Sequence, residues 1–428
     1  MQLTQSQKRA VRCFEEGKNM FLTGEAGTGK STLIRHFQAL MPEMSITATT
    51  GTAAFLIGGQ TLHSWAGLGI ALNPSVESAL GFLRRRKSKA IDRWKTCKCL
   101  VIDEISMLSA ATFELVNKIA QAIRGNKRPF GGLQVILCGD FYQLPPVGAT
   151  KYAFESAVWC EIVEENVVLK EVLRTNDVHF RQILAEARIG EISAKSKAGL
   201  GKRQLLPPIG GVQPTKLYAI NRQVCDLNTR QLKQLETEVL TYDATVRKTG
   251  VIHRSVAASL IQASDEHGAY TKMLQIAIGA QVMLTVNLDV KSGLFNGSRG
   301  IVVDFKTFRG KLLPVVEFVS GCRKPIGIHW WSLLERNGTR LERGQIPLKL
   351  AWAITIHKSQ GLSLDCVSIS IGRDIFEYGQ AYVALSRVRS LSGLFIEDYK
   401  TDAFKSDQRV RDFYKTLKCA RLITDFFV

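Results

Sequence analysis

The chain has 428 residues, enough for two or three domains at roughly 100 to 200 residues each. With 45% apolar residues and no apolar run of the ~20 residues that cross a membrane, the composition predicts a globular protein without a membrane-spanning helix. Lysine and arginine number 57 against 38 aspartate and glutamate, a formal net charge of +19. That charge favours a polyanionic partner, such as nucleic acid, a ribosome or a membrane surface, over an acidic small substrate.

Nine cysteines are spread through the chain and no signal peptide precedes them, so the sequence predicts reduced thiols in a cytosol-like compartment. Cys97 and Cys99 form a C-x-C pair without a second pair at metal-ligand spacing. Because a tetrahedral zinc site needs four ligands, we do not expect zinc here.

The first half of the chain alternates apolar strands with amphipathic helices. Apolar side chains at helical spacing predict helices over residues 5–14, after residue 30, and from Phe113 to Ile123. The segments interpreted as strands are NMFLTG (19–24), SITATT (45–50), KCLVIDE (98–104) and LQVILCGD (133–140). Near-continuous apolar strands of this kind are typical of a parallel sheet covered on both faces, so we expect an α/β domain.

The second half predicts another α/β domain. Its apolar segments are TKLYAI (215–220), AQVMLTV (280–286), LKLAWAIT (348–355), CVSISI (366–371) and GLFIE (393–397). Residues 294–346 differ, because short β-rich runs there alternate with Gly and Pro turns, and they predict a small all-β insertion. Residues 193–214 are rich in Gly, Pro and Ser, which predicts a linker or hinge loop.

The segment GEAGTGKS (24–31) carries the clearest chemistry in the sequence. It satisfies G-x-x-x-x-G-K-[ST] between a predicted strand and a predicted helix. In that context the glycines let backbone N–H groups face phosphates at a helix N-terminus. Lys30 would neutralise the β and γ phosphates, and the Ser31 hydroxyl would bind Mg²⁺. A chance Gly-rich turn would not explain the flanking strand and helix, so we predict ATP or GTP binding.

Three further segments carry polar groups that phosphoryl transfer requires. Asp103 and Glu104 close the strand VIDE, where the first can hold Mg²⁺ and the second can polarise water, although solvated carboxylates at a strand end are the alternative. Gln143 follows the next strand and could sense a γ-phosphate, or belong only to a rigid turn. Arg387 follows an apolar helical stripe and could be an arginine finger or a surface ion pair.

Basic and aromatic side chains are compatible with a nucleic-acid surface, and each group also has an alternative interpretation. The run from Arg84 to Lys95 is strongly basic and contains Trp94, which fits phosphate neutralisation or a solvated helix face. Four other tryptophans could stack bases or belong to the core: Trp65, Trp330, Trp331 and Trp352.

Taken in order, the motif segments resemble those of superfamily-one DNA helicases of the Pif type. They are GEAGTGKS, TATTGTAA, GGQTLHSW, VIDEISML, GDFYQLPPV, AWAITIHKSQG and AYVALSRV. LTQSQ, with Gln7, is similar to the adenine-reading Q motif, so the resemblance covers nearly the whole chain. KRPFGGLQVILCGD and GAQVMLTVNLD favour the Pif branch over its RecD-like relatives.

The resemblance implies two RecA-like parallel-sheet (P-loop NTPase) domains, with a small all-β SH3-like insertion in the second. ATP would lie in the cleft between the two domains, with single-stranded DNA across them. The implied bounds are 1–172 for domain one, with a pin segment at about 58–80, then 173–293 with 347–428 for domain two, and 294–346 for the insertion.

The resemblance also assigns roles by position. The implied catalytic residues are Lys30, Asp103, Glu104, Gln143, Arg174 and Arg387, with Arg174 and Arg387 supplied by domain two. ATP would contact Gln7, Gly24, Ala26, Gly27, Thr28, Gly29, Lys30, Ser31, Thr32 and Gly361, and Mg²⁺ would be held by Ser31 and Asp103. The implied DNA contacts are Thr50, Gly51, Thr61, His63, Thr355, His357 and Lys358.

The activity that this resemblance implies is ATP-dependent 5′-to-3′ unwinding of DNA by a monomer on single-stranded or tailed duplex DNA, without sequence specificity and without a membrane. G-quadruplex DNA and work in repair, recombination or telomere-like maintenance are further implications. The residues alone indicate only a P-loop ATPase with a polyanionic partner. A RecD-like translocase, a remodelling ATPase without strand separation, and a DNA-binding module with a decayed site are the alternatives.

The chain lacks the long extensions of eukaryotic members of this family, so we expect a bacterial or phage source and a cytoplasmic location.

Overall fold

The computed structural model describes residues 3–68, 75–85, 89–204, 213–267, 270–289, 294, 296–308, 310–336 and 339–424. The density of internal contacts divides the chain into two compact units. Unit 1 comprises Met1–Lys202, Ile371–Leu391 and Tyr399–Val428, and unit 2 comprises Arg203–Ser370 and Ser392–Asp398. The domain bounds expected from the resemblance stay a prediction. Within the described part, no helix has the length and apolar character to cross a membrane.

Unit 1 is built on a parallel sheet. Its described strands are β1 (Met20–Gly24), β2 (Ser45–Ala48), β3 (Gln60–Thr61), β4 (Cys99–Asp103), β5 (Gln134–Gly139) and β6 (Glu165–Leu169), in the order β3-β2-β4-β5-β1-β6. Strand β1, next to the edge strand β6, pairs with β5 from Met20↔Ile136 and with β6 from Met20↔Glu165. Because all the pairs are parallel, the carboxyl ends of β1, β4 and β5 meet at one edge.

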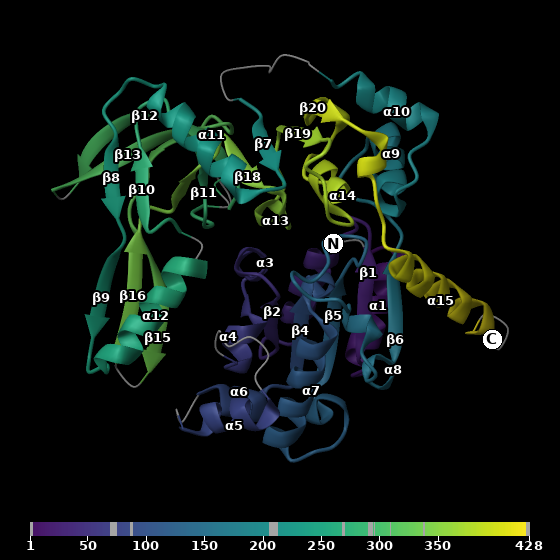
Figure 1. The fold of residues 1–428 in the computed structure, drawn as a ribbon. Coiled ribbons are helices and arrows are strands. Elements are labelled where there is room, and N and C mark those ends of the chain that lie inside the picture. The colour runs from purple at the N-terminus through teal and green to yellow at the C-terminus, as the bar shows by residue number, and fades with distance from the viewer. Residues whose placement is uncertain are drawn as a thin grey trace. The chain divides into compact units, whose positions relative to one another are not determined.

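Unit 1 also contains helices, several of which cover this sheet (Figure 1). They are α1 (Gln5–Glu15), α2 (Lys30–Leu40), α3 (Gly51–Leu56), α4 (Leu62–Ala66), α5 (Val76–Arg85), α6 (Lys89–Thr96), α7 (Ala110–Arg124), α8 (Trp159–Ile162), α9 (Val178–Ile189), α10 (Ala194–Gly201), α14 (Gln380–Leu385) and α15 (Gln408–Thr424). Short 3₁₀ turns lie at Ile105–Met107, Pro129–Gly132, Ala153–Glu155, Leu391–Gly393 and Thr401–Ala403.

The apolar pattern of the strands explains why both faces of this sheet are covered. In β4, Leu100 and Ile102 belong to one core cluster, with α7 and α15, whereas Cys99 and Val101 belong to a second cluster, with α1 and α2. A strand that buries both of its faces needs apolar residues at nearly every position. This confirms the α/β fold and the parallel sheet that the first four apolar segments predict.

Unit 2 combines several smaller sheets. Its described strands are β7 (Thr215–Tyr218), β8 (Leu240–Asp243), β9 (Thr245–Thr249), β10 (Met273–Ile276), β11 (Gln281–Leu284), β12 (Arg299–Phe308), β13 (Lys311–Phe318), β14 (Arg323–Pro325), β15 (His329–Arg336), β16 (Thr339–Gln345), β17 (Leu348–Leu350), β18 (Ala353–Thr355), β19 (Val367–Ile371) and β20 (Leu394–Tyr399). Its helices are α11 (Asn221–Lys233), α12 (Arg254–His267) and α13 (Ile356–Ser359).

Within unit 2, strands β18 and β19 both pair in parallel with β7, in the sheet β18-β7-β19-β20. Antiparallel sheets of order β14-β13-β12-β11-β17 and β15-β16-β9, and the pair β10-β8, account for the other described strands. Strands β12 to β16 fall inside residues 294–346, which have the Gly- and Pro-punctuated β pattern.

Three assignments from the sequence were wrong. The segment 280–286 forms β11, which pairs antiparallel with β12 and β17 rather than joining the second parallel sheet. The segment 348–355 is not one strand but two, β17 and β18, in different sheets. A short apolar run has the same pattern in any fully buried strand, so periodicity could not distinguish these sheets.

The third correction concerns the first part of residues 193–214, which were expected to be a linker or hinge loop; residues 205–212 lie outside the described residues. Residues Ala194–Gly201 form helix α10, whose N-cap is the Ser193 side chain, accepting from the Ser196 N–H at 3.2 Å. Leu200 is fully buried, and a Cβ on Gly199 would lie 2.4 Å from His179 Nε2 on α9. The glycine therefore permits close helix packing here instead of marking a loop.

Candidate nucleotide site

The loop between β1 and α2 requires its glycines. Gly27 and Gly29 have φ of 88° and 89°, in the left-handed region that side chains rarely adopt. A Cβ on Gly27 would lie 2.5 Å from Arg174 Cβ, and one on Gly29 would lie 2.8 Å from Gln7 Nε2. Neither glycine can be replaced without displacing a neighbour, so the loop keeps a close turn of half-buried backbone. The N–H groups of such glycine-rich loops bind phosphate oxygens.

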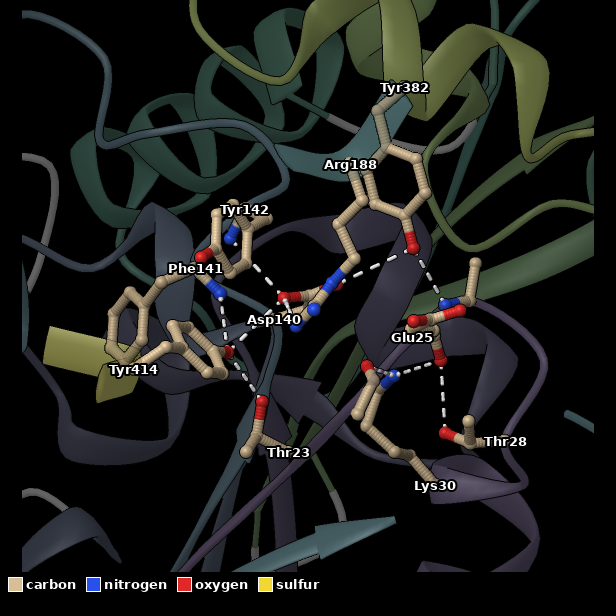
Figure 2. A network of polar contacts seen from close by, with 12 residues as sticks. Thr23, Glu25, Thr28, Lys30, Asp140, Phe141, Tyr142, Arg188, Tyr382 and Tyr414 are labelled. Carbon is tan, nitrogen blue, oxygen red and sulfur yellow. Dashed lines mark hydrogen bonds and ion pairs between the residues drawn. The ribbon is translucent and has the colours of Figure 1, made fainter. Parts of the chain in front are cut away.

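The Lys30 ammonium group lies within the loop itself (Figure 2). Its Nζ donates to the carbonyl oxygens of Gly24, at 2.6 Å, and Glu25, at 3.0 Å. The Thr28 hydroxyl also donates to the Glu25 carbonyl, at 2.9 Å. At the start of α2, Ser31 is exposed and Thr32 is half-buried. The loop therefore holds its lysine where phosphate oxygens could take the place of the two carbonyls.

Asp103 and Glu104 lie at the end of β4, on the edge that carries the phosphate loop. Asp103 is buried, and burial raises the pKa of its carboxyl although the Lys30 ammonium acts in the opposite direction. Glu104 has φ 54°, and its N–H donates to Asp103 Oδ1 at 2.9 Å. A left-handed conformation at a non-glycine residue is strained and often marks a functional position. The two carboxylates suit a cation and a water beside bound phosphates.

The other three candidate catalytic residues, Gln143, Arg174 and Arg387, also lie in unit 1. Gln143 is buried after β5, against the left-handed Gly379 that precedes α14. Arg174 Nη1 donates to the Ser386 carbonyl at 3.1 Å. Arg387 Nε donates to the carbonyl of Val383 at 2.8 Å. The two arginines were expected in the second domain, whereas the density of contacts groups both with the phosphate loop.

The electrostatics of these arginines favour an added anion. Burial, and then the charge of Arg174, lower the pKa of Arg387 to about 10. The pKa of Arg174 is also lowered, chiefly by burial, while Glu104 acts in the opposite direction on both. Burial disfavours the charged form of a guanidinium, and an added negative charge favours it. A phosphate bound here would supply such a charge.

Gln7 was expected to read adenine. It is buried in α1, where it forms a capping box with Thr4, and its Nε2 donates to the Thr28 carbonyl at 3.3 Å. The side chain therefore supports the phosphate loop, and adenine contact stays a prediction.

The DNA-contact candidates of unit 1 lie beyond β2 and β3. The Thr50 and Thr61 hydroxyls each accept from a backbone N–H three residues later, at 3.2 and 3.3 Å, and so cap α3 and α4. Gly51 and His63 on these helices are exposed. The exposed groups could meet a phosphate backbone, although part of the pin segment, residues 69–74, lies outside the described residues.

The candidates in unit 2 surround α13. The Thr355 hydroxyl accepts from the Lys358 N–H at 3.2 Å, His357 is half-buried and Lys358 is exposed. Gly361, the nucleotide candidate, follows in a left-handed conformation, with φ 78°. Burial, and then the Lys358 ammonium, lower the pKa of Lys349 to about 8, so this place also favours an anion.

Two alternatives from the sequence are decided by burial. Trp65 and Trp352 are 1% and 6% exposed and belong to the cores of their units, so neither stacks bases. In the basic run, Arg93 donates to the carbonyls of Ser64 and Trp65, which makes it a structural residue. The side chains of residues 84–89 lie outside the described part.

Four residues beside the phosphate loop were not selected from the sequence as site residues. Asp140, Arg188, Tyr382 and Tyr414 form a buried polar network that reaches the loop. Asp140 and Tyr382 lie inside motif segments, so the sequence carried a signal for them. Arg188 and Tyr414 lie on α9 and α15, outside every motif, and only the fold brings them to the site.

Replacing Asp140 by Ala is expected to lower the free energy of unfolding by about 3 to 5 kcal/mol, because the buried Arg188 guanidinium loses its partner. Burial acts to raise the pKa of Asp140, but the charge and hydrogen bonds of Arg188, together with the Lys30 charge and the Tyr142 N–H, outweigh it, and the net pKa is lowered. The stabilisation is therefore present above the unfolded carboxyl pKa of about 4 and is lost as pH falls through the lower folded pKa. Urea unfolding should show a difference in the free energy of unfolding between wild type and variant that becomes smaller below about pH 4. A difference that stays constant with pH would contradict this assignment.

A phosphate loop at the end of an inner parallel strand, with a buried aspartate and a glutamate at the end of β4, two strands away in the same sheet, defines a P-loop NTPase. The chain matches the family described as PIF1-like helicase over residues 2–197, and the Pif1 helicase 2B domain over residues 263–305. The ATP-dependent DNA helicase PIF1 of Danio rerio is 42% identical over 98% of this chain and 65% of the relative.

Among solved structures, the Pif1 helicase of Candida albicans is 34% identical, with a TM-score of 0.82 over 97% of this chain and 100% of that chain. The Bacteroides Pif1 helicase in complex with ADP-AlF3 and ssDNA is 26% identical, with a TM-score of 0.71 over 98% of each chain. The chain therefore belongs to the Pif1 helicase family, as the motif resemblance predicted, and its fold has two RecA-like domains.

The chain spans about two thirds of the length of the curated vertebrate relatives, 65% in the fish and human proteins. The similar curated proteins are mainly from eukaryotes, so the expected bacterial or phage source is not supported.

Proposed function

We propose that this protein is an ATP-dependent DNA helicase that moves 5′ to 3′ on single-stranded DNA and separates duplex DNA. Membership of the Pif1 family supports the activity, since the relatives carry the name ATP-dependent DNA helicase. The phosphate loop and the two arginines, Arg174 and Arg387, support the nucleotide part. Unwinding of G-quadruplexes, and roles in repair, recombination or telomere maintenance, stay predictions.

The chemistry proposed at the site is hydrolysis of the γ-phosphate. Lys30 would neutralise the β and γ oxygens, and Glu104 would polarise the attacking water. Arg174 and Arg387 would stabilise the charge that develops during transfer. Gln143 would orient the water or sense the γ-phosphate.

Mg²⁺ fits the residues present. The exposed Ser31 hydroxyl and the Asp103 carboxylate are oxygen donors of the kind that this cation prefers, and the raised pKa of Asp103 reflects burial without a full countercharge. Mg²⁺ would supply charge neutralisation on the phosphates.

The observation that carries DNA coupling is a pair of hydrogen bonds. The Thr49 N–H donates to the Asp103 carbonyl at 3.2 Å, and its hydroxyl donates to the Glu104 carbonyl at 3.0 Å. Thr49 directly precedes Thr50 and Gly51, the first of the DNA-contact candidates. A DNA strand bound at Thr50 would therefore be connected, through the two hydrogen bonds of Thr49, to the backbone of Asp103 and Glu104. This supports an ATPase that DNA stimulates.

Strand displacement tests the proposal with its polarity. Two identical duplexes, one with a 5′ and one with a 3′ single-stranded tail, are incubated with ATP and Mg²⁺. We expect unwinding of the 5′-tailed duplex alone, and none with Lys30→Ala, because the variant loses the phosphate countercharge. Opening of the 3′-tailed duplex would contradict the polarity, and DNA-stimulated hydrolysis without opening would favour a RecD-like translocase or remodelling ATPase.

We also propose that a monomer suffices. The similar solved structures include two coordinating Pif1 helicases at forked dsDNA, so the same duplex should be tested over a range of protein concentrations. Initial rates that rise linearly would support a monomer, and a second-order rise would overturn it.

A further inference from the structure

A buried carboxylate, Asp140, lies behind the phosphate loop of unit 1 (Figure 2). It is fully buried at the end of β5. Arg188 on α9 donates to both of its oxygens, from Nη2 to Oδ1 at 2.8 Å and from Nε to Oδ2 at 2.9 Å. Two tyrosine hydroxyls also donate to it, Tyr414 to Oδ1 at 3.2 Å and Tyr382 to Oδ2 at 3.5 Å.

The charge of this carboxylate sets the direction of the neighbouring hydrogen bonds. Paired with Arg188, Asp140 stays ionised and can only accept. Each tyrosine has one hydroxyl hydrogen, and both hydrogens are directed to Asp140. The tyrosine oxygens are then acceptors for every other donor near them.

Those other donors belong to the phosphate loop and its strand. The Ala26 N–H donates to the Tyr382 oxygen at 2.9 Å. The Thr23 hydroxyl is 2.6 Å from the Tyr414 oxygen and, by the preceding argument, donates to it. Thr23 and Ala26 flank Gly24 and Glu25, so the backbone of the loop is tied on both sides to one buried charge.

This arrangement matters most when nucleotide is bound. In the structure, the Lys30 ammonium group donates hydrogen bonds to the carbonyls of Gly24 and Glu25, and the Thr28 hydroxyl donates to the carbonyl of Glu25. A lysine that turns to phosphate oxygens must release those carbonyls. The tyrosine hydroxyls keep their hydrogens on Asp140 and so would continue to hold the loop when the lysine moves.

We propose that Tyr382 and Tyr414, anchored on Asp140, are positioning residues that hold the phosphate loop in its nucleotide-binding conformation. The inference rests on the proposed nucleotide binding and adds residues from α14 and α15 to that site. Because Tyr382 precedes Arg387 on the same segment, it also ties the arginine to the loop. The hydroxyls touch no reacting atom, so their loss should weaken nucleotide binding more than turnover.

The test uses Tyr382→Phe, Tyr414→Phe and the double variant in the full chain. Tyr399→Phe is the matched control, since the Tyr399 hydroxyl finds no hydrogen-bond partner among the described residues. ADP affinity is measured by titration without DNA, KM and kcat for ATP are measured with saturating single-stranded DNA, and DNA affinity is measured without nucleotide. Melting temperature is recorded for each variant.

We expect each single variant to raise the ADP Kd and the ATP KM about 5- to 10-fold, the effect of one hydrogen bond. The kcat should stay within about twofold, and DNA affinity should not change. In the double variant the increase in the ADP Kd should be smaller than the product of the two single increases, because both hydroxyls act through Asp140.

Folded variants with unchanged ADP affinity, or with reduced kcat at unchanged KM, would overturn the inference. If Tyr382→Phe fails to fold, Tyr414→Phe decides alone. If the wild-type protein does not bind ADP, the result contradicts the proposed function itself rather than the role of the tyrosines.

Discussion

Replacing Arg387 by Ala is expected to lower kcat for ATP hydrolysis by ~10³ or more. The guanidinium is 2% exposed, and its pKa is lowered to about 10 by burial and by the charge of Arg174. A positive charge held in this environment gains most when negative charge develops beside it, which occurs in the transition state. Single-turnover and steady-state hydrolysis with saturating single-stranded DNA measure the effect.

The control is Arg389→Ala, which removes an exposed arginine two residues later. Its kcat should stay within about twofold of wild type. Arg387→Lys should recover only part of the rate, because an ammonium cannot make the two parallel bonds of a guanidinium. If Arg387→Ala has an unchanged kcat and an unchanged ATP affinity, the assignment of Arg387 as an arginine finger is wrong and its role is structural.

The Glu104→Gln variant is expected to bind ATP and DNA yet lose about 10² to 10⁴ in kcat. The amide has nearly the same shape, so the hydrogen bond from the Glu104 N–H to Asp103 and the one from the Thr49 hydroxyl to the Glu104 carbonyl, both of which use the backbone, should persist. Only the group that accepts a proton from water is lost. Rapid-quench measurement of a single turnover separates this loss from slow product release.

Glu114→Gln is the matched control, since Glu114 is a half-buried carboxylate of unit 1 that accepts from the Ser156 hydroxyl. It should hydrolyse ATP as the wild type does. Normal single-turnover hydrolysis by Glu104→Gln would contradict the assignment of Glu104 as the water-activating residue.

The phosphate loop and the β4 carboxylates could be located from sequence because their chemistry is local. A glycine-rich turn between an apolar strand and an amphipathic helix has few other uses. Asp103 and Glu104 follow directly from the end of an apolar strand. Other assignments failed where periodicity is ambiguous, as for β11, or where glycines permit close packing, as in α10.

The sequence by itself therefore determined the family, the parallel sheet of unit 1 and the position of the phosphate loop, because short motifs and strand patterns encode them. Only the tertiary structure decided that Arg188 and Tyr414 belong beside the phosphate loop. Arg188 lies 48 residues after Asp140, and Tyr414 lies 274 residues after it. No local pattern records a contact over such separations, since the buried carboxylate selects its partners by the space and charge that the folded chain places around it.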